Sequence, residues 1–134
     1  IRFWPLRGEL SFAGHARVVV SEGSIPPQRL TALGGFGSIA SHPLNAYRME
    51  TGSLWTFEAL IRPFRDSRSR LLQDLSLVIG GEWCVLEQVD RPAETHGGLG
   101  IYISTATGTM RSGIAIPTDG GFNPRLAVRL ERPF

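Results

Sequence analysis

Glycine and proline interrupt this chain so often that few segments are long enough to form a helix. The 134 residues include 16 glycines and 9 prolines, which are spread along the whole length. A typical helix needs roughly ten or more residues without such a breaker, whereas a strand needs only about five. We therefore predict an all-β protein with at most one short helix.

Short runs of alternating apolar and polar residues support this prediction. Within residues 53–61, Trp55, Phe57 and Ile61 lie an even number of residues apart, and the positions between them are half polar. This period is typical of a strand with one wet side. The predicted strands are residues 16–20, 44–50, 53–61, 82–89, 99–105, 112–116 and 125–131.

Other segments are less regular. Residues 71–79 fit both a strand and a helix, and we favour a strand because turn signals bound the segment closely. Gly80 and Gly81 are predicted to form a hairpin turn between antiparallel strands. Residues 91–98 are predicted to be a loop, and the Gly/Pro-rich residues 21–43 a long loop or arm.

The length fits one domain, residues 1–134, with one hydrophobic core. Short strands at this spacing favour an antiparallel β-sandwich or a small closed barrel of jelly-roll-like architecture. Trp55, Trp83 and Val128 lie on apolar faces and are expected in the core. The single Cys84 excludes an intramolecular disulfide and is expected to be a small buried thiol.

The chain contains no lysine, so arginine supplies all the side chains that Lys and Arg would otherwise share. In this sense we describe the chain as arginine-rich. A formal net charge of +2 is too small to demand a polyanion, so nucleic acid is a possible but not a favoured partner. No run of apolar residues is long enough for a membrane helix, so we expect a soluble protein that does not bind membranes. Because the chain starts at Ile1, the localisation stays open, with a virion as one possibility.

The usual catalytic and cofactor motifs are missing. His15, His42 and His96 do not recur at a metal-binding spacing, although a site could still assemble from distant loops. Residues 35–40 match Gly-x-Gly-x-x-Ala, but a strand and a helix do not flank them as a nucleotide site requires. Without lysine the phosphate-binding loop is impossible. We therefore predict no catalytic, cofactor-binding or metal-binding residue and no cofactor.

Five residues are predicted to make interactions. Arg65, Arg68 and Arg70 lie in one polar connection, where guanidinium groups can grip carboxylates or phosphates. Trp4 lies beside Pro5 near the start of the chain and is the best candidate for an exposed aromatic anchor. Phe36 belongs to the Gly-rich part of the arm and completes the set.

These observations favour a non-enzymatic structural or assembly protein. It would act through self-association, as a homo-oligomer or part of a larger protein assembly, for example as an accessory component of a virion capsid or tail. The alternative is a β module that binds a carbohydrate or another small ligand. A small enzyme whose site assembles from loops, with His42, His96, Cys84 or glutamates, is a third hypothesis.

Overall fold

The computed structural model describes residues 9–21, 26, 29–35, 38–88, 91–105 and 110–130. Within these residues the fold is mostly β, with a six-stranded antiparallel sheet, a two-stranded sheet and one short helix. The predicted fold class is therefore confirmed. Trp4 and Phe36, two of the predicted interaction residues, lie outside the described residues.

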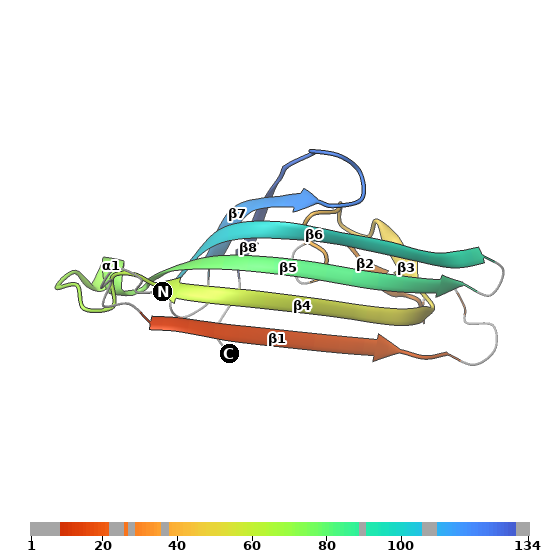
Figure 1. Cartoon of the computed structure of the whole chain (residues 1–134), viewed down its shortest axis with the longest axis horizontal. Coiled ribbons are helices and arrows are strands. Elements are labelled where there is room, and N and C mark those ends of the chain that lie inside the picture. The colour runs from red at the N-terminus through yellow and green to blue at the C-terminus, as the bar shows by residue number, and fades with distance from the viewer. Residues whose placement is uncertain are drawn as a thin grey trace, which may run out of the picture.

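The large sheet follows the order of the chain except for one excursion (Figure 1). Its strands, in spatial order, are β1 (Glu9–Val19), β4 (Thr51–Arg62), β5 (Leu75–Gln88), β6 (Arg91–Thr105), β7 (Met110–Pro117) and β8 (Arg125–Leu130). The excursion contains β2 (Thr31–Leu33) and β3 (Tyr47–Met49), which pair with each other, and the helix α1 (Arg70–Gln73) lies between β4 and β5.

The large sheet is curled but does not close into a barrel. β1 and β8 are its two edges, and the described residues show no pairing between them. The strands also do not interleave as they would in a jelly roll. The segment that contains β2 and β3, here called the arm (residues 29–35 and 38–50), instead forms a partial second layer on one face. The closed-barrel alternative is therefore wrong, whereas a sandwich-like arrangement fits.

The core lies between the arm and the sheet face that it covers, here called the covered face. One cluster joins arm residues to β4 and β5, and it consists of Leu33, Ile39, Met49, Leu54, Cys84 and Leu86. A second cluster joins the arm to β5, β6, β7 and β8, and it consists of Ala40, Val78, Tyr102, Ala115 and Ala127. The predicted burial of Cys84 is confirmed, since its exposure is 0%.

Small residues on the covered face make room for one large ring. A Cβ atom at Gly100 would lie 2.0 Å from the Tyr102 hydroxyl, and one at Gly113 would lie 2.8 Å from Cδ1 of the Tyr102 ring. The Tyr102 ring can therefore lie across the sheet only because its neighbours carry no side chain.

Several predicted boundaries are wrong for one shared reason, which is strand pairing. Gly80 and Gly81 form no turn but lie inside β5, where they pair with β4 and β6 on both sides. Residues 91–98 form no loop but begin β6. Ladder hydrogen bonds from a neighbouring strand hold such Gly-containing segments extended, against their local preference. Residues 71–79 divide between α1 and the start of β5.

The sequence pattern correctly groups Trp55 and Trp83 on one side of the sheet. The expectation that this side, and Val128 with it, faces the core is wrong. Trp55 and Trp83 are register partners, and they are 43% and 57% exposed. Val128 is 54% exposed, whereas its neighbour Ala127 is 7% exposed and belongs to the core. The arm packs closely against small residues such as Ala127, so the bulky alternate residues face the other way.

Candidate functional site

The side of the large sheet that no described segment covers, here called the open face, carries many large apolar side chains that water reaches. They are Leu10, Phe12, Val18, Trp55, Phe57, Ile79, Trp83, Leu99, Ile101, Ile103, Met110, Ile114, Leu126, Val128 and Leu130. The largest apolar patch on a typical soluble monomer covers only a few hundred Å². The open face presents on the order of 1,000 Å² of apolar surface, which makes it a candidate interaction surface.

The open face is also almost free of charge. Away from the strand ends, every charged residue of the large sheet that the structure describes projects to the covered face, as Glu58, Glu82 and Arg111 do. Glu87 lies at the end of β5. Such a surface does not favour binding of a strongly charged partner, because a charge buried against it would lose its hydration without gaining a counter-ion.

Of the predicted arginines, Arg65 and Arg68 lie in the connection between β4 and α1, and Arg70 is the first residue of α1. This connection lies beyond the end of β4 (Figure 1). Arg65, Arg68 and Arg70 are all exposed. The Arg65 guanidinium lies 3.2 Å from a Glu9 carboxylate oxygen, which also lies 3.3 Å from Arg62. An exposed pair of this kind contributes little to stability, so these residues remain available for contacts with another molecule.

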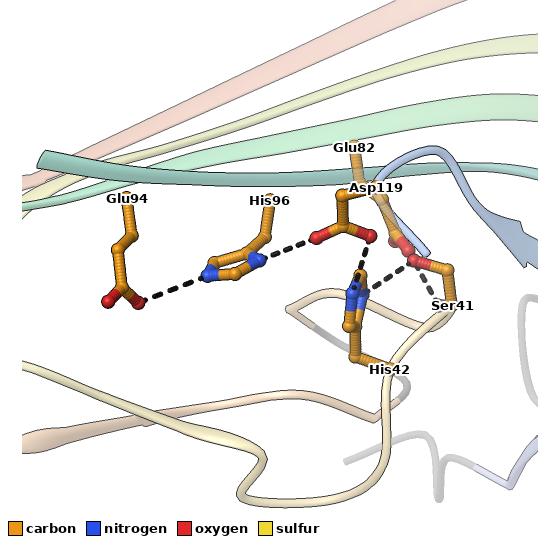
Figure 2. Close-up of polar contacts among 6 residues, drawn as sticks. All are labelled: Ser41, His42, Glu82, Glu94, His96 and Asp119. Carbon is orange, nitrogen blue, oxygen red and sulfur yellow. Dashed lines mark hydrogen bonds and ion pairs between the residues drawn. The ribbon is translucent and has the colours of Figure 1, made fainter. Parts of the chain in front are cut away.

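A polar cluster forms where the arm meets the large sheet (Figure 2). His42 comes from the arm, His96 from β6 and Asp119 from the loop between β7 and β8. His42 Nε2 lies 3.0 Å from one Asp119 carboxylate oxygen, and His96 Nδ1 lies 2.5 Å from the other. One carboxylate thus joins two imidazoles from segments that are far apart in the sequence.

Further side chains lie beside the two imidazoles (Figure 2). The Ser41 hydroxyl lies 3.0 Å from His42 Nδ1, and a Glu94 carboxylate oxygen lies 3.5 Å from His96 Nε2. The Tyr47 ring stacks on His96, with 3.9 Å between the ring centroids. The rings of the cluster are therefore held from the arm and from the sheet at the same time.

The electrostatics of the cluster favour an ionised carboxylate. Partial burial raises the pKa of Asp119, but its hydrogen bond with His96, a hydrogen bond with its own backbone and the electrostatic effect of the two nearby imidazoles together lower it by more, so that the net pKa lies below its usual range. His42 is buried, and His96 is partly buried. Asp119 can therefore act as an anionic oxygen ligand near neutral pH.

The cluster does not support a nucleophilic mechanism. Ser41, His42 and Asp119 make successive contacts in the order of a hydrolytic triad, but Ser41 is only 1% exposed, so a substrate could not reach its hydroxyl. Burial also raises the pKa of the Cys84 thiol to about 11, which keeps it in the unreactive protonated form. The geometry of these residues thus gives no support to the enzyme hypothesis.

Sequence reasoning missed this cluster because its members lie in distant segments. Asp119 is 23 residues from His96 and 77 residues from His42. No spacing rule covers such distances, and residues 91–98 were predicted to be a loop, so His96 had no expected partner. The only indication of the cluster in the sequence analysis is the general expectation that a metal site could assemble from histidines in distant loops.

A cavity of about 550 Å³ opens on the covered face. Its walls come from the arm and from strands at both edges of the curled sheet, and its polar lining includes Arg17, Glu58, Glu82, Tyr102, Arg111 and Arg129. Arg111 and Glu58 form a bidentate ion pair within it. Burial raises the pKa of Tyr102, so its hydroxyl stays protonated.

The described residues include no helix that is long and apolar enough to cross a membrane. No family model matches the chain, and comparison with curated proteins and with solved structures finds no match. Any function is therefore inferred from the residues and their geometry.

Proposed function

We propose that this chain is a non-enzymatic assembly subunit that associates with a second copy of itself through the open face. The observation that carries this proposal is the large, nearly charge-free apolar surface on one side of the sheet. Water-exposed apolar surface of this extent is unfavourable, and its removal from water is the main driving force of protein association.

The size of the open face suits such an interface. A standard stable interface buries about 800 Å² on each partner, and the open face offers on the order of 1,000 Å². Two sheets that pack face to face lie about 10 Å apart, with interdigitated side chains. Two copies of this sheet would therefore form an interface of the sandwich type, with the arms on the outside.

The chemistry of the face favours a second copy as the partner. A two-fold interface brings a surface against itself, so any charge near its centre would meet a like charge. The open face avoids this penalty because the strand charges project to the covered face. A subunit of this kind suits a larger particle built from repeated copies, such as a virion capsid or tail.

Light scattering across a wide range of protein concentration, at low and high salt, tests the proposal. We expect a dimer or a defined higher oligomer that high salt leaves intact or strengthens, because salt does not screen apolar contacts. A monomer throughout would contradict the proposal. An oligomer that salt dissociates, and that alanine at Arg65, Arg68 and Arg70 weakens, would instead show an interface made by the arginines.

The cavity on the covered face supports a second candidate function, which is binding of a small anionic ligand. Arg17 and Arg129 contribute to its lining together with Arg111, which is paired with Glu58, and guanidinium groups recognise carboxylates and phosphates. The tryptophans lie outside this lining, so the cavity suits a sugar less well, because sugar sites rely on exposed aromatic faces.

Titration with inorganic phosphate, followed by calorimetry, tests this second function. We expect Arg17→Ala to weaken binding about tenfold or more, because it removes one charge-assisted contact. The matched control is Arg48→Ala, since Arg48 is exposed on β3 and does not line the cavity. Equal binding by both variants and the native chain would exclude the cavity as the site.

A further inference from the structure

We propose that His42, His96 and Asp119 form a binding site for a divalent first-row transition metal ion, for which Zn²⁺ serves as the probe. Each residue offers one ligand atom, and these atoms all lie within 4.8 Å of one another. This inference is independent of the open face, because the cluster lies on the covered side of the sheet.

The ligand atoms lie close to the positions that a metal ion requires. Zinc bonds to imidazole nitrogen and carboxylate oxygen at about 2.0–2.2 Å, which places ligand atoms of a tetrahedral site roughly 3.4 Å apart. His42 Nε2 lies 3.0 Å and His96 Nδ1 2.5 Å from oxygens of Asp119. The ion would replace the hydrogen that each imidazole shares with Asp119. Each of these two close pairs would move apart by less than about 1 Å, and ligand atoms that lie up to 4.8 Å apart would move together to reach the tetrahedral spacing.

The groups beside the second nitrogen of each imidazole are of the chemical types found in known metal sites. A metal-bound histidine usually turns its second ring nitrogen toward a carboxylate, a carbonyl or another polar group, which fixes the ring. In this protein Ser41 Oγ lies beside His42 Nδ1, and Glu94 beside His96 Nε2. His96 Nε2 is buried and lacks a hydrogen bond at its present 3.5 Å distance from Glu94, which a small movement of that exposed carboxylate would supply.

The donor set decides the class of ion. Magnesium and calcium prefer oxygen ligands alone, whereas two imidazoles and one carboxylate suit zinc, iron, cobalt, nickel or copper. His96 and Asp119 are partly exposed, at 16% and 24% of their side-chain surface, so an ion can enter from solvent. Three protein ligands leave a further coordination position for water or another small molecule.

Metal binding would join three separate parts of the fold. The ligands come from the arm, from β6 and from the loop between β7 and β8, and the unfolded chain does not hold them together. Binding free energy therefore adds to folding stability. We expect Zn²⁺ to raise the thermal midpoint of chelator-treated protein, and to bind with a stoichiometry of one ion per chain.

Calorimetric titration with Zn²⁺ and visible spectroscopy with Co²⁺ test the site on the full chain. His96→Ala and Asp119→Asn should each weaken Zn²⁺ binding by about 100-fold or more and greatly reduce the Co²⁺ ligand-field bands, because the first removes an imidazole ligand and the second replaces an anionic oxygen with a weakly coordinating neutral amide. The control His15→Ala should leave both signals unchanged, since His15 is exposed on β1 and lies outside the cluster.

Two outcomes would overturn the metal site. One is a folded native chain that binds neither Zn²⁺ nor Co²⁺. The other is binding that His96→Ala and Asp119→Asn leave intact, whether or not His15→Ala removes it. If His96→Ala fails to fold, the conservative variant His96→Gln, checked by circular dichroism, provides the same comparison. Metal binding by a monomeric open-face variant would separate this site from the assembly function.

Discussion

Replacing Phe57 with glutamate is expected to convert the self-associated protein into a monomer that stays folded. Phe57 lies near the middle of β4 on the open face and is 60% exposed in the single chain, so the monomer tolerates a charge there. In a face-to-face dimer the same charge would be buried without a partner, at a cost of about 3–5 kcal/mol. We expect the dissociation constant to rise by at least about 100-fold, since each factor of ten corresponds to 1.4 kcal/mol.

A second phenylalanine supplies the matched control. Phe122 is 82% exposed in the loop between β7 and β8, outside the open face, so Phe122→Glu should leave the dissociation constant unchanged. Light scattering gives the mass of each variant, and circular dichroism verifies that it is folded. Equal association by the two variants would refute the open-face interface, as would a loss of association in Phe122→Glu alone.

Replacing Ala127 with aspartate is expected to unfold the protein, whereas aspartate at the adjacent Val128 should not. Ala127 is 7% exposed and packs in the core cluster with Val78, Tyr102 and Ala115. An unpaired carboxylate there costs several kcal/mol, which is comparable to the whole free energy of unfolding of a typical domain, about 5–15 kcal/mol.

Val128 tests the opposite face of the same strand. Its side chain is 54% exposed and pairs in register with Ser112, so Val128→Asp should retain the β circular-dichroism signal and lose self-association. Urea unfolding followed by circular dichroism measures the difference between the two variants. Unfolding by Val128→Asp with a stable Ala127→Asp would show that the register of β8 is shifted by one residue.

Local sequence pattern was enough for the fold class and for most strands. The even spacing of Trp55, Phe57 and Ile61 predicted a strand, and β4 contains all of it, because alternation follows directly from the pleat of an extended chain. The apolar pattern of residues 112–116 and 125–130 likewise lies in β7 and β8, and residue 131 of the predicted strand is outside the described residues. The buried position of Cys84 also followed from its small apolar character.

Local pattern was not enough where a distant strand decided the conformation. Gly80 and Gly81 have a strong turn preference, yet both lie in the middle of β5. The paired strands on each side provide hydrogen bonds that outweigh the local preference, and nothing within the segment itself indicates that such partners exist. Residues 91–98 extend β6 for the same reason.

The sequence by itself determined that the chain alternates between two kinds of sheet face, and the tertiary structure alone decided which face is covered. Alternation gives each residue a side but carries no information about the layer that packs there. The arm selected the face with Ala115 and Ala127, because small residues allow close approach, and it left Trp55 and Trp83 exposed. The same packing brought His42 beside His96 and Asp119, which no spacing along the chain could have shown.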